Sequence, residues 1–227
     1  MSSRTGLPVF ATLVPLLVAC ASDQPAYGSG SGELGKGSLY VTCTPEDAAC
    51  EPGAATLEKG GPIAVGASFH MTYDGQIPLA PTGDPSTMIL FSASPSMLSV
   101  GEDEFVAWLP GYVAVIARTA EGTVTDFTHV ELAAVAKVEL ERSPAEASTQ
   151  LVVGQQGVWL AAPVSSDDLV LAGSLAYTWE VDGTSVEVAA FSGRSVTLVA
   201  RESGTSTLRA QTGEAKGETT ITVEAAP

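Results

Sequence analysis

Short runs typical of β-strands, separated by turn-forming residues, follow one another along most of this 227-residue chain. The runs are rich in Val, Thr and aromatic residues, and Gly, Asp, Pro and Ser lie between them, which predicts strands joined by turns. No stretch of a dozen residues combines apolar residues at the 3.6-residue period of a helix with helix-capping residues at its ends. Residues 132–140 have helical propensity, but we interpret them as a junction between strands. The expected strands are 38–42, 67–73, 88–94, 105–109, 112–119 and 124–132, followed by 137–140, 158–162, 175–181, 186–190, 196–200, 205–211 and 218–223. The pattern predicts an all-β chain of β-sandwich type.

The two series of runs are similar to one another. Residues 63–66 (IAVG) parallel 151–154 (LVVG), 88 positions later, and 111–117 (GYVAVIA) parallel 204–210 (GTSTLRA), 93 positions later. The extra residues fall between strands, where a repeated sandwich tolerates insertions. We therefore expect two tandem domains, at 37–136 and 137–227.

Residues 138–225 resemble a bacterial immunoglobulin-like domain of the group 2 type, because five segments follow the order of that family. These segments are Ser143-Pro144-Ala145, Leu151-Val152-Val153-Gly154, Tyr177-Thr178-Trp179-Glu180, Gly204-Thr205-Ser206-Thr207-Leu208-Arg209-Ala210 and Thr219-Thr220-Ile221-Thr222-Val223. The first unit departs further from the family, since Phe91 replaces its tryptophan and a cysteine-bearing segment is inserted. The resemblance implies tandem immunoglobulin-like β-sandwiches that contact proteins or glycans through sheet faces and end loops.

Aromatic side chains are expected to fill both cores. They are Phe69, Phe91, Trp108 and Phe127 in the first domain, and Trp159, Tyr177, Trp179 and Phe191 in the second. Arg118 and Thr119 are expected to be exposed. The junction 133–136 is short and apolar, which predicts two domains end to end with limited hinge motion.

The amino terminus has the pattern of a processing signal. A short basic region with Arg4 precedes an apolar run of about 13 residues, too short to cross a bilayer. Residues 17–20 (LVAC) resemble the bacterial lipobox, which implies cleavage after residue 19 and acylation of Cys20. The alternative is an ordinary secretory signal with an incidental cysteine. Residues 20–36 are rich in Gly and Ser and are expected to form a flexible linker.

The remaining cysteines, Cys43 and Cys50, lie seven positions apart. In an oxidising compartment we expect them to form a disulfide. A metal or redox role lacks the C-x-x-C spacing and a nearby histidine.

Acidic residues raise the possibility of calcium binding, with Glu102, Asp103 and Glu104 as weak candidate ligands. We favour solvated acidic loops, because none of these residues belongs to a D-x-D-x-D-G loop. The two histidines, His70 and His129, lie on expected strands, and no nucleophile motif accompanies them. The sequence therefore predicts no enzyme, no cofactor and no metal centre.

Charge narrows the possible partners. The formal net charge of -16 argues against nucleic acid and against electrostatic binding to anionic lipids. Residues 33–136 hold 13 acidic and 3 basic residues, against 12 and 6 in 137–227, so a basic partner or a cation is expected first at the first domain. Outward threonines such as Thr205 and Thr220 fit either a ligand-binding face or an ordinary solvated sheet.

These observations predict a non-catalytic lipoprotein of the cell envelope that is anchored through Cys20. We expect it to act as a binding, adhesive or structural module through its immunoglobulin-like domains. The residues after Cys20 favour the outer membrane by resemblance to the enterobacterial sorting rule. The alternative is an accessory subunit of a secretion or appendage complex.

Overall fold

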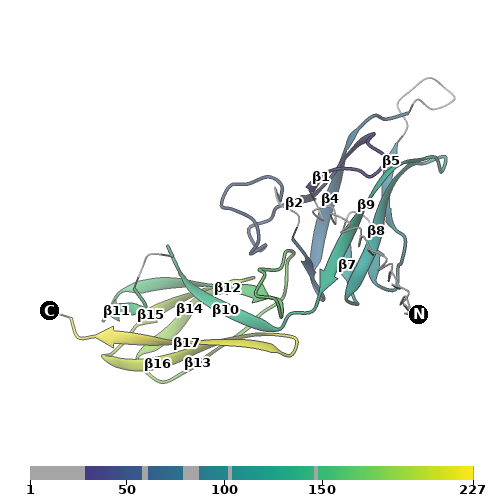
Figure 1. Cartoon of the computed structure of the whole chain (residues 1–227). Coiled ribbons are helices and arrows are strands. Elements are labelled where there is room, and N and C mark those ends of the chain that lie inside the picture. The colour runs from purple at the N-terminus through teal and green to yellow at the C-terminus, as the bar shows by residue number, and fades with distance from the viewer. Residues whose placement is uncertain (1–28, 58–60, 79–86, 102–103, 146–147, 227) are drawn as a thin grey trace, which may run out of the picture.

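Two β-sandwiches follow one another along the chain (Figure 1). The computed structural model describes residues 29–57, 61–78, 87–101, 104–145 and 148–226. These residues form strands, turns and loops, and within them we find no helix with the length and apolarity needed to cross a membrane. The predicted all-β fold is confirmed.

The first sandwich packs a five-stranded sheet against a four-stranded sheet. The five-stranded sheet has the order β1 (Ser29–Ser31), β2 (Gly37–Thr42), β4 (Ser68–Gly75), β7 (Phe105–Ala107), β6 (Leu98–Val100). The four-stranded sheet has the order β3 (Ile63–Ala64), β9 (Val124–Ala133), β8 (Gly111–Thr119), β5 (Met88–Ser92). Among the described strands of this domain, β3 and β9 form the one parallel pair.

The second sandwich repeats this order in two four-stranded sheets. One sheet runs β10 (Lys137–Ser143), β12 (Gln156–Val164), β15 (Ser195–Ala200), β14 (Val186–Ser192). The other runs β11 (Gln150–Val152), β17 (Ala215–Glu224), β16 (Gly204–Thr212), β13 (Thr178–Asp182). Apart from β1, each strand of the first domain has a counterpart here. If β10, β12, β13, β14, β15, β16 and β17 are lettered A to G in chain order, the sheets are A-B-E-D and C-F-G, as in the immunoglobulin fold. The chain therefore contains two immunoglobulin-like sandwiches.

All thirteen expected strands are present, with ends shifted by a few residues. Strands β1, β3, β6 and β11 were not expected, because two or three residues are too few to show alternation. Strand β1 lies within the range predicted as a linker. Its residues, Ser29 to Ser31, bring no apolar side chain, and pairing with β2 holds them.

The aromatic cores match the expectation in part. Phe69 and Trp159 are buried as predicted, whereas Trp108 and Phe191 are 55% and 69% exposed, so the prediction for these two is wrong. Trp108 lies in the turn after β7, past the end of the core. Phe191 lies near the end of the edge strand β14, where residues 189–192 are all exposed.

Two polar side chains near the first core, Arg118 and Thr119, are less exposed than predicted. Thr119 is buried rather than exposed, because it closes the turn between β8 and β9 by exchanging hydrogen bonds with Thr123. Arg118 is half-buried, with its guanidinium 4.2 Å from the centre of the Phe91 ring. Phe91 therefore lies under a cation instead of in the core.

Candidate functional site

A segment of the second domain completes the hydrophobic core of the first. The segment connects β12 to β13, and its residues Leu171, Ala172 and Leu175 are buried among the side chains of the first core. Leu171 and Ala172 are fully buried. Burying a leucine contributes about 1.5–3 kcal/mol, so the first domain gains stability from residues that follow the predicted boundary at 136/137.

The same segment is hydrogen-bonded to both sheets of the first domain. Ala172 donates to the Pro62 carbonyl and accepts from the Ala64 N–H, both at 2.9 Å, beside β3. Ser174 and Ser68 exchange two backbone bonds of 2.8 and 3.0 Å at the start of β4. Because β3 and β4 belong to different sheets, residues 172–174 bridge the two sheets of the first sandwich.

Between these two contacts, Gly173 approaches the first domain closely. Its φ is +97°, and an added Cβ would lie 2.8 Å from the Cβ of Ala67, so both conformation and space require glycine. Its N–H donates to Oδ2 of Asp47 at 2.9 Å. Asp47 is only 4% exposed, and its Oδ1 accepts the Ala49 N–H at 2.9 Å.

A disulfide closes the loop that holds Asp47. Cys43 and Cys50 are joined with an S–S distance of 1.97 Å. A hydroxyl pair, Thr44 Oγ1 and Ser174 Oγ at 3.1 Å, links the same loop to the second domain. The cysteine-bearing insertion thus forms a loop fixed between the domains, and we name residues 43–50 with 171–175 the interdomain latch.

An ion pair holds the other end of the connecting segment to its own domain. Lys137 Nζ lies 2.7 Å from Asp168 Oδ1 and 2.9 Å from Glu139 Oε1. The hydrogen bond to Asp168, followed by the one to Glu139, raises the pKa of Lys137 to about 12.

A buried carboxylate fixes the amino-terminal hairpin of the first domain. Asp126 on β9 is fully buried and accepts the N–H groups of Leu34, Lys36, Gly37 and Phe127, at 2.8 to 3.0 Å. Burial alone raises the pKa of Asp126, but these backbone hydrogen bonds outweigh it and hold the pKa below the ordinary value.

Further contacts secure the hairpin. An added Cβ at Gly32 would lie 2.2 Å from the Asp126 carboxyl carbon, so the turn approaches the carboxylate as only glycine can. His129 Nδ1 and Glu33 Oε1 lie 2.5 Å apart on the surface.

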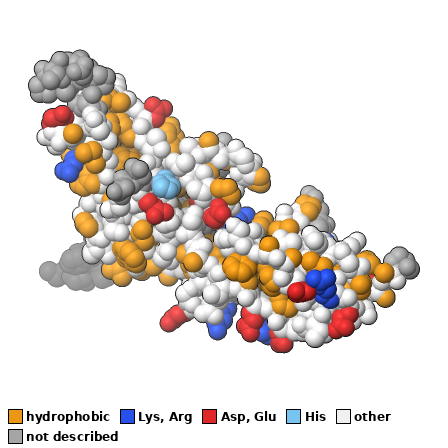
Figure 2. Space-filling model, turned by 180° about the vertical axis from the view of Figure 1, so that it is seen from behind, with side chains coloured by type: hydrophobic (Ala, Val, Ile, Leu, Met, Phe, Trp, Pro, Cys, Tyr) orange, Lys and Arg blue, Asp and Glu red, His pale blue; other side chains and the backbone are white. Residues whose placement is uncertain are grey.

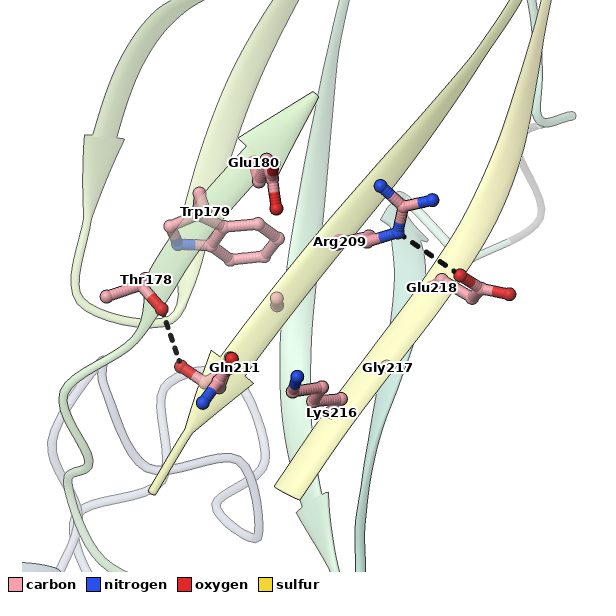
Figure 3. Close-up of a pocket in the computed structure, with 9 residues that line it drawn as sticks. Thr178, Trp179, Glu180, Arg209, Gln211, Lys216, Gly217 and Glu218 are labelled. Carbon is pink, nitrogen blue, oxygen red and sulfur yellow. Dashed lines mark hydrogen bonds and ion pairs between the residues drawn. The ribbon is translucent and has the colours of Figure 1, made fainter. Parts of the chain in front are cut away.

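A polar groove lies on the outer face of the second domain, across β13, β16 and β17 (Figure 3). Its volume is about 530 Å³. Two cross-strand rows flank it, Glu180–Arg209–Glu218 and Thr178–Gln211–Lys216. Arg209 lies 3.3 Å from Glu218 and 3.6 Å from Asp182. The groove therefore offers amide, guanidinium and carboxylate groups to a polar ligand.

None of the predicted site residues is among those that line this groove. Cys20, Glu102 and Asp103 lie outside the described residues, and Glu104 is exposed, with its carbonyl accepting the Gly101 N–H at 2.7 Å. Within the described part of the chain, no three His, Cys, Asp or Glu side chains gather as metal ligands would. Sequence reasoning missed Asp47, Gly173 and Asp126.

The chain is similar to solved structures of bacterial surface proteins, at low sequence identity. No protein-family model and no curated protein matches the chain. Among solved structures, domains 1–6 of the surface layer protein SbsC match 87% of this chain at 16% identity, with a TM-score of 0.32. The Escherichia coli adhesin FdeC matches 73% at 12% identity (TM-score 0.36), and the Yersinia pseudotuberculosis adhesin InvE matches 85% at 13% (TM-score 0.34). The chain spans 29% of the SbsC chain and 61% of each adhesin chain.

Proposed function

We propose that this protein is a non-catalytic lipoprotein of the bacterial cell envelope that acts as a binding, adhesive or structural module. The observation that carries the proposal is the interdomain latch. Residues 171–175 pack into the first core and pair with both of its sheets, so the two sandwiches form one extended unit. A rigid unit on an acylated cysteine holds a binding surface at a set distance from the membrane.

The groove on β13, β16 and β17 is the surface that we assign to the partner. Its planar hydrogen-bonding groups, Arg209, Gln211 and Glu218, suit a protein or a glycan. The ion pairs of Arg209 are exposed and contribute about 0–1 kcal/mol, so a ligand can displace them at little cost.

Labelling with a radioactive fatty acid tests the anchor. The wild-type protein is expected to incorporate the label and Cys20→Ser to lose it. Equal labelling of the two would remove lipidation from the proposal. Protease treatment of intact cells then separates the possible locations, since a surface module is cleaved and a periplasmic one is protected.

Mild cross-linking followed by co-purification tests the groove. We expect the wild-type chain to retain a partner that Arg209→Ala loses. Arg201→Ala is the matched control, because Arg201 is also exposed and ion-paired, with Glu187, but lies outside the groove. Equal loss from both variants would overturn the assignment. A single stoichiometric envelope protein as the partner would favour an accessory subunit over an adhesin.

A further inference from the structure

An exposed apolar surface lies at one end of the first domain, and we name Met97, Trp108, Leu109 and Tyr112 the apolar corner. Trp108, Leu109 and Tyr112 are 55%, 52% and 49% exposed. Single exposed apolar residues are ordinary, but three large apolar side chains that are each about half exposed within five positions indicate a contact surface.

The corner is held in a fixed shape. The backbone N–H of Trp108 donates to the Met97 carbonyl at 2.7 Å, and its indole Nε1 donates to Ser99 Oγ at 2.8 Å. An added Cβ at Gly111 would lie 2.7 Å from the Met97 methyl carbon, so the turns after β5 and β7 pack on each other. The indole is therefore presented with its hydrogen bond already made, and its insertion costs little conformational entropy.

The two turns of the corner carry no charged side chain. The turns 93–97 and 108–110, together with the strand residues 88–92, 98–100, 105–107 and 111–117 that flank them, contain no Asp, Glu, Lys or Arg. Glu131, opposite Tyr112 on the neighbouring strand, marks the boundary of the uncharged surface. On the face drawn in Figure 2, charged side chains of both signs gather on the second domain, and hydrophobic ones make up much of the lower end of the first.

The first described residue, Ser29, lies toward the end of the first domain at which the corner lies. Strand β1 is antiparallel to β2, with Ser29 opposite Tyr40 and Ser31 opposite Ser38. Ser29 is therefore the residue of β1 closest to the end of β2 at Thr42.

Strand β4 begins at that same end. Its first residue, Ser68, pairs with Val106, two positions before Trp108. Nine positions separate Cys20 from Ser29, and a chain of that length spans at most about 30 Å. An acyl anchor on Cys20 would thus keep the corner within reach of the bilayer surface.

We propose that the apolar corner inserts into the interfacial region of the membrane that holds the anchor. Trp and Tyr rings favour that depth, and Leu109 adds apolar area. The high negative charge gives no attraction to lipid, so insertion depends on the high local concentration that a short tether provides. The inference rests on the lipid anchoring proposed above.

The second domain extends away from β8, the strand that follows the turn of the corner. Strand β8, which begins at Gly111, lies on the right side of the first domain in Figure 1, and the second domain extends to the left. With the corner in the interface, the latch fixes the orientation of the second domain to the membrane.

Tryptophan fluorescence on vesicles tests this contact. Trp159 is fully buried and Trp179 is half-buried, so Trp108 is the indole that a membrane can reach. A polyhistidine tag replaces residues 1–20 and binds the chain to phosphatidylcholine vesicles that contain a nickel-chelating lipid and brominated acyl chains. This anchor makes the result independent of lipidation, which the labelling of Cys20 tests separately.

We expect wild-type emission to shift to shorter wavelength and to be quenched by the brominated chains. Trp108→Ser is expected to lose the shift and the quenching, and Leu109→Ser, which keeps the indole, to reduce both. Phe191→Ser removes a side chain that is still more exposed but lies in the second domain, and it should match the wild type. Near-ultraviolet circular dichroism confirms that each variant is folded. Wild-type quenching no greater than that of Trp108→Ser would overturn the proposal, as would equal quenching of wild type and Leu109→Ser.

Discussion

Asp126 shows how one buried carboxylate can fix a turn that lies about ninety positions away in sequence. Its oxygens accept N–H groups from the turn between β1 and β2 and from its own strand. A buried carboxylate is costly unless hydrogen-bonded, and here several donors satisfy it, so the interaction favours the ionised form. Tyr73, beside the same turn, has its pKa raised by burial and by the charges of Asp126 and Asp74.

The lowered pKa of Asp126 predicts acid-sensitive stability. Its stabilisation is fully present above the unfolded-state value of about 3.9 and is lost as pH falls through the lower folded-state pKa. We expect Asp126→Asn to lower the free energy of unfolding at pH 7 by about 2 kcal/mol or more, since hydrogen bonds to charged groups contribute about 1.5–3 kcal/mol each. We also expect the variant to show a shallower decline of that free energy below pH 4. Urea unfolding at several pH values measures both effects.

Asp74→Asn is the control for this experiment, because Asp74 is an exposed carboxylate on β4, the strand that pairs with β2 of the hairpin. It should change stability by less than about 0.5 kcal/mol. If Asp126→Asn kept the same pH dependence as the wild type, the carboxylate would not be the group that stabilises the hairpin.

At the scale of elements, alternation and turn residues predicted the long strands, but not the contacts of short ones. The run from Leu175 to Val181 reads as one strand, yet β13 begins only at Thr178, because Leu175 turns into the core of the other domain. Periodicity reports that a side chain is buried and not against which domain it is buried. Asp47 and Gly173 escaped prediction for the same reason, since 126 positions separate the two partners of their hydrogen bond.

The connecting segment predicts that a substitution in the second domain destabilises the first. Leu171→Ala is expected to cost about 2–5 kcal/mol, because it opens a cavity in the first core. Hydrogen exchange should show faster exchange of amides in β3 and β4. Leu169→Ala, two positions earlier and 52% exposed, should change stability by less than about 0.5 kcal/mol. Faster exchange confined to the second domain would contradict this role of Leu171.

At the scale of the whole molecule, the two repeated sandwiches and the short junction between them were predictable from sequence. The contacts that hold one domain against the other were not. Three residues, 134–136, separate β9 from β10. A junction of this length limits how far the domains can separate, but it does not by itself fix the angle between them. The latch adds backbone bonds to both sheets, a buried carboxylate and a disulfide-closed loop. The angle between the domains is therefore set by side contacts that the sequence places far from the junction.

This arrangement predicts that removing one carboxylate loosens the whole molecule. Asp47→Ala leaves the Gly173 N–H without its acceptor inside the interface, which costs about 1–3 kcal/mol and weakens the docking of the loop. Small-angle scattering of the wild type should fit one conformation, whereas Asp47→Ala should require an ensemble of interdomain angles. Glu51→Ala is the matched control, because Glu51 is an exposed acid beside the same loop. Superimposable profiles of wild type and Asp47→Ala would mean that core packing alone sets the angle. A broadened profile for Asp47→Ala only would identify the cysteine-bearing insertion as the element that makes two domains act as one rigid unit.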